Sequence, residues 1–367
     1  MTNFALSDEL EGLAAAARAL GHEWAARRTI REDSWIVGFD REFSLELGRR
    51  GWLGMTWPVE EGGHGRPPIE RLVVTEALIS TGAPIAASWF GDRQIGPSLL
   101  TFGTAEQRRR YLPPLVEGSA TWCLGMSEPD AGSDVAAIAT SAVRDGGEYV
   151  IDGAKVWTSF AEVAEHCYLI ARTDPDAPPH AGLSELIVPM GSPGITVSPI
   201  KDMSGARHFC EVRFERVRVP AEHLVGELNG SFRQLMRQLE HERGGIDRLV
   251  SNRALYEDAR DAADRDDPLV RQELAAIESA YRLGRLLVIR EVVGQAPRSF
   301  SAATKLFCTV LEQRVARLCG TVFGADALCT ERLARALCYA PAYTIQGGTN
   351  EILRNVIGER ILGLPRQ

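Results

Sequence analysis

The chain has 367 residues, of which 45% are hydrophobic and 25% are charged, and its net charge is −8. This length suffices for two or three packed units. The negative charge argues against a nucleic-acid partner and against an anionic membrane surface. No apolar run approaches the roughly 20 residues that span a bilayer, and the N-terminus has no basic segment followed by an apolar core. We therefore expect a cytoplasmic protein with no membrane and no nucleic-acid partner.

Cysteine and histidine spacing excludes two further classes of protein. Seven cysteines are scattered without a Cys-x-x-Cys pair, and the seven histidines show no metal-ligand spacing. An odd, unpatterned set of cysteines is typical of reduced thiols. The sequence therefore predicts neither a disulfide framework nor a metal site.

Residues 1–120 have helical patterns. Ser7 opens an amphipathic segment rich in alanine and leucine, and Thr104 with Gln107 forms a capping box for a later helix. The glycine-rich loop at residues 57–65 separates such segments. We predict an N-terminal helical domain over these 120 residues.

Residues 121–226 change to short apolar runs that are punctuated by glycine and proline. Asp145-Gly146-Gly147 and Asp152-Gly153 are hairpin signals between such runs. Six or seven strands predict a small antiparallel sandwich or barrel. The helical period returns over residues 227–367 and predicts a four- or five-helix bundle.

Two segments of the predicted sheet carry polar groups next to apolar strands. Residues 122–134 read Trp-Cys-Leu-Gly-Met-Ser-Glu-Pro-Asp-Ala-Gly-Ser-Asp, and residues 155–159 read Lys-Val-Trp-Thr-Ser. Ser127, Ser133 and bare backbone N–H groups gather where the first strand ends, which suits a flat ligand with polar edges. An ordinary tight turn is the alternative interpretation.

The string Ser-Glu-Pro-x-Ala-Gly-Ser-Asp closely resembles the flavin-binding signature of the acyl-CoA dehydrogenase family. Residues 155–159 are similar to that family's Lys-x-Trp-[Ile/Thr]-[Thr/Ser] segment, and residues 57–65 to its Trp-Pro-x-Glu-x-Gly-Gly-x-Gly loop. The resemblance covers essentially the whole chain. It implies FAD as cofactor and a reaction that removes an α-proton and a β-hydride from an acyl thioester. It also implies an all-α domain, a middle antiparallel β-sandwich or barrel and a C-terminal helical bundle.

The resemblance assigns cofactor contacts to three segments, at the first strand and turn, at residues 157–159, and near the C-terminus. These cofactor-binding residues are Leu124, Met126, Ser127, Ser133, Trp157, Thr158, Ser159, Thr349 and Glu351. Ser133 also matches a hydroxyl that lies between flavin and substrate. For Trp157 the alternative interpretation is an aromatic residue of the core.

The catalytic base departs from the commonest family pattern. Many members place a glutamate immediately before Gly-Thr, where this chain has Gly347, which can offer an N–H to a thioester carbonyl but cannot abstract a proton. Glu242 matches the second family solution, a glutamate on the first helix of the bundle. It stands at i+7 from Leu235 and i−4 from Ile246, on the apolar face of one predicted helix. Burial there would raise its pKa, as a base requires.

Substrate contacts are implied for residues near both segments. Glu240 and Arg243 match positions that meet pantetheine and CoA, and Gly347 and Gly348 match the loop at the thioester. The alternative for Glu242 is an ion pair with Arg243 or Arg248 on the bundle surface. The thioester handle is either CoA or an acyl carrier protein.

The adenine end of the flavin site departs from the family. The acidic run at residues 258–267 contains no Arg-x-x-Phe-Gly, and the Gln-x-x-Gly-Gly loop appears as Thr-Val-Phe-Gly-Ala at residues 321–325. Because the family binds FAD across a subunit boundary, we expect either a homo-oligomer, with Arg265 or Arg271 at the phosphates, or a heteromer with a paralogous chain. Electron-transfer flavoprotein is the implied electron acceptor.

Three functions remain open from the sequence. The first, which we predict, is an FAD-dependent acyl-CoA dehydrogenase close to the members that act on bulky, branched or steroid side-chain thioesters; the other two are alternatives. The second is another flavin activity on the same fold, such as an N-hydroxylase or a nitroalkane oxidase. The third is a non-catalytic partner subunit of a heteromeric acyl-CoA dehydrogenase.

Overall fold

The computed structural model of the chain describes residues 6–235, 245–297 and 299–365. The chain divides into two compact units, the first with residues 1–43, 66–86 and 240–367 and the second with residues 44–65 and 87–239. The division into domains at 1–120, 121–226 and 227–367 stays a prediction. The predicted order of helices, strands and helices along the chain is confirmed.

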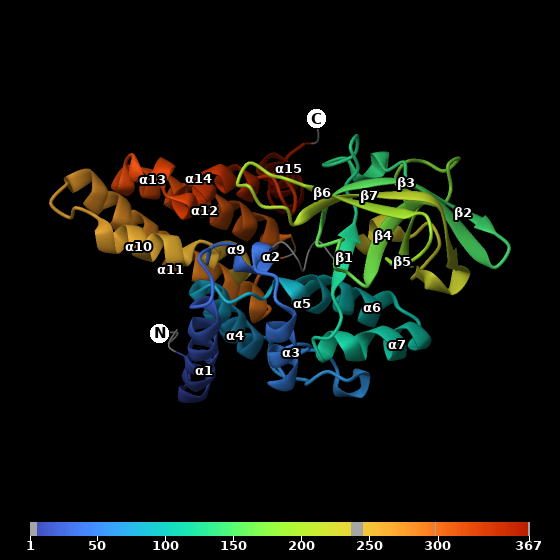
Figure 1. Ribbon diagram of the computed structural model, residues 1–367, viewed down its shortest axis with the longest axis horizontal. Helices are drawn as coiled ribbons and strands as arrows, with labels where there is room; N and C mark the ends of the chain where they lie inside the picture. Colours follow the sequence, from blue (N-terminus) through green and yellow to red (C-terminus); the bar gives the residue numbers. More distant parts are fainter. Residues whose placement is uncertain (1–5, 236–244, 298, 366–367) are drawn as a thin grey trace. The chain divides into compact units, whose positions relative to one another are not determined.

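The first unit is helical. Its helices are α1 (Asp8–Ala25), α2 (Ser34–Val37), α4 (Pro68–Thr81), α9 (Ile246–Val250), α10 (Arg253–Ala262), α11 (Pro268–Val292), α12 (Phe300–Phe323), α13 (Asp326–Cys329), α14 (Glu331–Tyr343) and α15 (Asn350–Val356). The long helices α11, α12 and α14 lie side by side, in orange and red in Figure 1. The start of α11 is set by Asp267, whose carboxylate accepts from the N–H of Leu269 at 2.8 Å, and by the proline that follows it.

The second unit contains a sheet of eight strands within the described residues. They are β1 (Trp122–Gly125), β2 (Ser141–Asp145), β3 (Glu148–Ser159), β4 (His166–Arg172), β5 (Leu183–Pro189), β6 (Ile195–Ile200), β7 (Phe209–Pro220) and β8 (Leu224–Val225). The strand order is β6-β7-β3-β2-β4-β5-β8, with β1 paired to β4. Most pairs are antiparallel, as predicted, but β1 and β2 both run parallel to β4.

Helices α6 (Gly96–Phe102) and α7 (Ala105–Val116) belong to the same unit and lie beside the sheet (Figure 1). Helices α3 (Arg41–Arg49) and α5 (Ala86–Phe90) lie where the chain passes from one unit to the other. The predicted capping box starts α7: Thr104 Oγ1 accepts from the N–H of Gln107 at 3.2 Å, and Gln107 Oε1 accepts from the N–H of Thr104 at 3.0 Å. Two backbone donors at the helix start are thereby satisfied.

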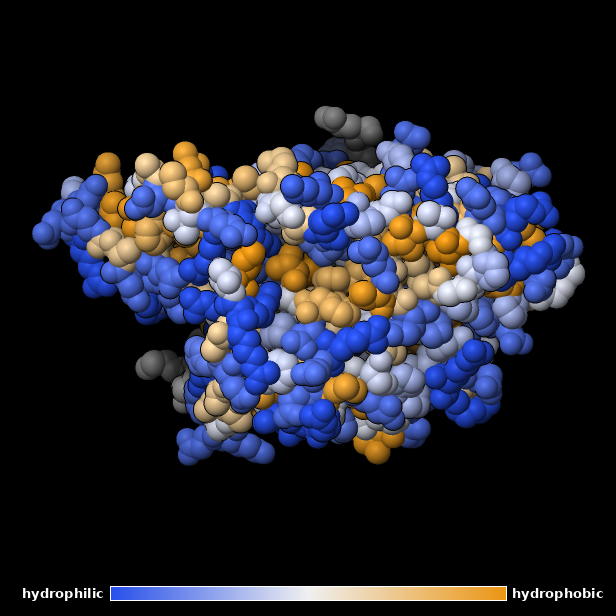
Figure 2. All heavy atoms as spheres, viewed as in Figure 1, coloured by the Kyte–Doolittle hydropathy of each residue, from blue (hydrophilic) through white to orange (hydrophobic). Residues whose placement is uncertain are grey.

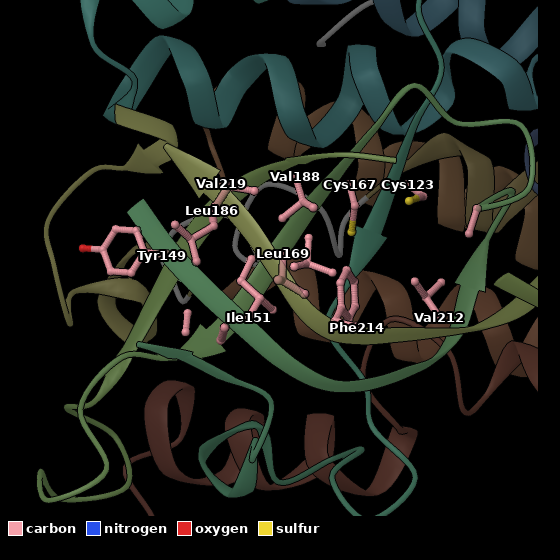
Figure 3. Close-up of a cluster of buried hydrophobic side chains, with 14 of the residues drawn as sticks. Cys123, Tyr149, Ile151, Cys167, Leu169, Leu186, Val188, Val212, Phe214 and Val219 are labelled. Carbon is pink, nitrogen blue, oxygen red and sulfur yellow. The ribbon is translucent and has the colours of Figure 1, made fainter. Parts of the chain in front are cut away.

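Strands β4 and β5 are buried along almost their whole length because both of their faces are covered. One face contributes Cys167, Leu169, Leu186 and Val188 to the core in Figure 3, where Cys123 and Cys167 lie close together. The other face contributes Tyr168 and Ile187, which pack with Tyr111, Leu112 and Leu115 of α7. The apolar run from Cys167 to Ala171 in β4 follows from burial on both sides, whereas β5 also buries the polar residues Ser184 and Glu185.

One predicted hairpin is correct and the other is wrong. Asp145-Gly146-Gly147 forms the turn between β2 and β3, whereas Asp152-Gly153 lies inside β3, at a shift in its register with β7. A Cβ on Gly153 would lie 2.6 Å from Thr140 Oγ1, and Asp152 Oδ1 accepts from the N–H of Arg216 at 2.8 Å. The dipeptide therefore makes a β-bulge, which uses the same small and polar residues as a turn.

The single helix predicted from Leu235 to Ile246 is also wrong. Residues 231–235 are helical, but Gly245 has extended dihedral angles of φ −139° and ψ 154° and precedes a separate helix, α9. A glycine costs a helix interior about 1 kcal/mol, so an interruption at this position is inexpensive. Glu242 itself lies outside the described residues.

No helix in the described residues is long and apolar enough to cross a membrane. Hydrophilic residues, in blue, cover much of the face in Figure 2, and apolar residues reach the surface over α13 and α14. Leu328 of α13 is an exposed apolar residue.

Candidate functional site

The two predicted flavin segments lie side by side in the second unit. Strand β1 ends at Gly125, and residues 128–131 then form a tight turn in which the N–H of Glu128 donates to the carbonyl of Ala131 at 2.9 Å. The N–H of Val156 donates to the carbonyl of Ser127 at 2.9 Å. This backbone bond brings the end of the first segment against the start of the second.

A buried ion pair fastens the same two segments. Lys155 Nζ lies 2.8 Å from Glu128 Oε1 and donates to the carbonyl of Met126 at 3.0 Å. The Glu128 carboxylate also accepts from the N–H groups of Ala139 at 2.7 Å and Thr140 at 2.9 Å. Both charged groups are thus paired and hydrogen-bonded, which is what burial of charges requires.

The pKa values of Glu128 and Lys155 are shifted by burial and by the charge of the partner. Burial raises the pKa of Glu128, but the charge of Lys155 and the hydrogen bonds to the carboxylate outweigh that effect and lower it. Burial lowers the pKa of Lys155 to about 8, although the carboxylate opposes the shift. The pair is therefore ionised at neutral pH.

Trp157 is an exposed residue with an unusual backbone. It lies at a second register shift between β3 and β7, its φ is +60°, and its side chain is 56% exposed. Its ring meets Phe209 edge-on at 5.8 Å. The alternative interpretation as a core aromatic is therefore wrong. A bulky residue with positive φ stores about 1–3 kcal/mol, a cost often found at ligand sites.

The neighbouring hydroxyl has no hydrogen-bond partner among the described residues. Thr158 is buried, and its Oγ1 neither donates nor accepts there. Leaving such a group unsatisfied costs about 1–3 kcal/mol. Ser159 is also buried, whereas Leu124, Met126 and Ser127 are half-buried and Ser133 is exposed. A ligand with polar edges that lies against this strand end could hydrogen-bond to the Thr158 hydroxyl. These residues therefore fit a flavin ring.

The predicted C-terminal residues form a turn in the first unit. Gly347 and Gly348 both have left-handed backbones, with φ of +66° and +90°. Thr349 is the N-cap of α15, where its hydroxyl accepts from the N–H of Ile352 at 3.2 Å and keeps its own proton for donation. Glu351 is exposed and pairs with Arg354 at 3.2 Å.

A buried lysine of α12 is hydrogen-bonded to this turn. Lys305 Nζ donates to the carbonyls of Gly348 at 2.8 Å and Tyr343 at 3.3 Å, and to Asn350 Oδ1 at 3.3 Å. The carbonyl of Gly348 is thereby fixed to α12. The predicted residues Glu240, Glu242 and Arg243 lie outside the described residues.

The acidic run at residues 258–267 is partly used within the unit. Asp258 pairs with Arg332, and Asp267 caps α11. Of the two alternative phosphate-binding residues, Arg271 donates from Nη1 to the carbonyl of Arg265 at 3.0 Å. Within the described residues, no group of three or more His, Cys, Asp or Glu side chains could hold a metal ion.

Three functional candidates were missed from the sequence: Glu128 and Lys155, which join the flavin segments, and Arg248, which lies against Gly347. Lys155 carried a usable signal, because it is a lone cation within an apolar strand and such a residue requires a partner. Arg248 lay within the predicted helix and carried no comparable signal.

Three family models match the chain in sequence. The models describe the acyl-CoA dehydrogenase N-terminal domain at residues 7–119, the middle domain at 123–217 and the C-terminal domain at 229–362. Among curated relatives, "Acyl-CoA dehydrogenase IpdE1" of Mycobacterium tuberculosis is 35% identical over 99% of this chain and 96% of the relative.

Solved structures with the same fold include two-chain complexes. "Tcur3481-Tcur3483 steroid ACAD" superposes with a TM-score of 0.90 at 33% identity, covering all of both chains. The ChsE4-ChsE5 complex from Mycobacterium tuberculosis gives a TM-score of 0.87 at 30% identity, again over all of both chains. The fold class predicted from the sequence, with helical N- and C-terminal domains around a β-sheet domain, is thereby confirmed.

Proposed function

Because the chain belongs to the acyl-CoA dehydrogenase family, a family of flavoprotein oxidoreductases, we propose that it binds FAD and dehydrogenates an acyl thioester between its α and β carbons. The observation that carries this proposal is the joined pair of flavin segments. The Lys155–Glu128 ion pair fixes them, Thr158 offers an idle buried hydroxyl, and Trp157 holds an exposed aromatic face in a strained backbone.

The residues would divide the work as follows. Leu124, Met126, Ser127, Ser133, Trp157, Thr158 and Ser159, together with Thr349 and Glu351, hold the cofactor, which supplies a hydride acceptor when bound. The N–H of Gly347 polarises the thioester carbonyl. Glu242 removes the α-proton. Gly348, Ser133, Glu240 and Arg243 contact the substrate.

The base is tested by Glu242→Gln. This variant should retain FAD, because the amide is similar in size, and should reduce the flavin with an acyl thioester several orders of magnitude more slowly, since no carboxylate takes the α-proton. Glu222→Gln, an exposed residue of the other unit, is the control. Flavin reduction at a near-native rate in Glu242→Gln would assign the base to another carboxylate.

We further propose that the chain works as a heteromer with a paralogous chain. Its flavin-ring segments are complete, whereas both adenine-side motifs are absent and an acidic run, residues 258–267, stands in place of one of them. Two structural neighbours, Tcur3481-Tcur3483 and the ChsE4-ChsE5 complex, are two-chain complexes by name, which supports the same assembly. A homo-oligomer with Arg265 or Arg271 at the phosphates is the competing arrangement.

Expression of the chain alone and with a related chain separates these arrangements. We expect little flavin in the chain alone and restored flavin after co-expression, measured by absorbance and by mass in solution. One FAD per chain in a stable homo-oligomer would contradict the heteromer. We also propose that electron-transfer flavoprotein accepts the electrons from the reduced flavin. We propose a cytoplasmic location, in which all seven thiols are free.

A further inference from the structure

An arginine lies against the turn around Gly347, so that a side chain at this residue would have to displace the guanidinium. A Cβ built on Gly347 would lie 2.7 Å from Nη2 of Arg248, a distance that real Cβ atoms essentially never show. The φ of +66° independently disfavours an L side chain. The guanidinium therefore stands where many family members carry their glutamate.

Arg248 is held rigidly in this place. Its Cζ lies 4.5 Å from the centroid of the Trp35 ring, and its side chain is 8% exposed. The ring is fixed in turn, because Trp35 Nε1 donates to Ser251 Oγ at 2.7 Å. A guanidinium stacked on a fixed aromatic face keeps its position and its charge.

The positive charge of Arg248 is only partly balanced by its neighbours. Asp247 Oδ2 lies 3.7 Å from its Nε, which is a long ion pair, and Nη1 has no hydrogen-bond partner among the described residues. Burial raises the pKa of Glu312 well above its ordinary value, against the opposing charge of Arg248, which weakens Glu312 as a counter-charge. Asp33 already pairs with Arg335 at 3.1 Å.

We propose that Arg248 is a positioning residue of the dehydrogenation, which holds the Gly347 turn and places a fixed positive charge behind the peptide that polarises the thioester carbonyl. This inference rests on the proposed function. When the α C–H bond breaks, the proton passes to the Glu242 carboxylate and the electron pair moves onto the carbonyl oxygen as an enolate. A desolvated cation close to that peptide stabilises the negative charge.

The first test follows loss of the α-proton without oxidation. The probe is 3-thiaoctanoyl-CoA, whose sulfur at the β position prevents dehydrogenation, and the readout is α-proton exchange with D2O by NMR. We expect Arg248→Met to slow exchange at least roughly tenfold, in the range of removing one electrostatic donor, at unchanged FAD content. Arg248→Lys, which keeps the charge, should restore most of the exchange.

The matched control is Arg253→Met. Arg253 is also stacked on an aromatic ring, with its Cζ 4.6 Å from the centroid of the Tyr281 ring, but it has no proposed catalytic role. Native exchange in Arg248→Met would overturn the role of Arg248. All proteins are measured as the FAD-loaded form obtained by co-expression with the related chain. Absence of exchange in that wild-type complex would overturn the proposed function instead, so the two failures are distinguishable.

The second test needs no activity and measures the contact itself. Gly347→Ala should lower the melting temperature in the wild-type chain because of the strained backbone and the contact with Arg248. In an Arg248→Ala background the same substitution should cost less, by roughly 2–4 °C. Equal losses in both backgrounds would show that Arg248 does not occupy the space at Gly347.

Discussion

Lys155 Nζ lies 2.8 Å from Glu128 Oε1, and this buried ion pair joins two chain segments that are 27 residues apart. Each segment carries part of the proposed flavin contact. The ion pair therefore gives the strand end a fixed geometry before any ligand binds, as a binding site with several polar contacts requires.

Removing one member of this pair should be costly. Lys155→Met or Glu128→Gln leaves the other charge buried without compensation, so we expect a loss of about 3–5 kcal/mol in the free energy of unfolding for each. The double variant should lose less than the sum. Urea denaturation measures all four proteins. Strictly additive losses below 1 kcal/mol would show that the pair contributes little.

The Glu128 carboxylate should make the free energy of unfolding fall at acid pH. The pKa of Glu128 lies below its ordinary value of 4.5 in the folded chain, so the unfolded chain binds more protons near that pH. This contribution is present above about pH 4.5 and is lost as the pH falls through the folded pKa. Urea midpoints between pH 3 and 7 should fall less steeply in Glu128→Gln than in the wild type; parallel curves would contradict the assignment.

Trp157 should contribute to FAD binding while lowering the stability of the flavin-free protein. Because its positive φ is strained and its ring is exposed, Trp157→Gly should leave the flavin-free protein as stable or stabilise it by about 1 kcal/mol. The same variant should retain less FAD. Trp122→Ala is the control: Trp122 is buried in the core, so its removal should cost about 3–5 kcal/mol. A comparable loss in Trp157→Gly would make Trp157 structural.

A smaller substitution, at the Thr158 hydroxyl, should likewise weaken FAD binding without a loss of stability. Thr158→Val removes a buried oxygen that has no partner among the described residues, so the flavin-free protein should be unchanged or more stable while FAD binds more weakly. Thr309→Val removes a hydroxyl that donates to the carbonyl of Lys305 at 2.9 Å and should cost about 1 kcal/mol. Thermal unfolding with and without FAD compares the two.

Glu185 of β5 should hold the helical turn at residues 231–235. Its carboxylate accepts from Ser231 Oγ at 3.2 Å and from Gln234 Nε2 at 3.0 Å, and all three side chains are buried. Glu185→Leu leaves those donors unsatisfied. We expect faster amide exchange over residues 231–235, measured by mass spectrometry, with β2 and β3 unchanged. Native exchange over that turn would show that Glu185 does not hold it.

The sequence was sufficient for features that depend on local chemistry. The capping box at Thr104 and Gln107 and the turn at Asp145-Gly146-Gly147 were predicted correctly, because each is decided by a few neighbouring residues. The family motifs likewise predicted the fold class. The Asp152-Gly153 signal failed because a bulge and a turn use the same residues, and the helix through Gly245 failed because side-chain spacing does not reveal where a backbone turns extended.

Only the tertiary structure decided which of these residues are buried, strained or paired. Lys155 meets Glu128, and Arg248 lies against Gly347, through contacts between segments far apart in the chain. The exposure of Trp157 depends on the register of β3 against β7. Burial sets the cost of an unpaired charge or hydroxyl, and burial is a property of packed segments, which no local pattern in the sequence contains.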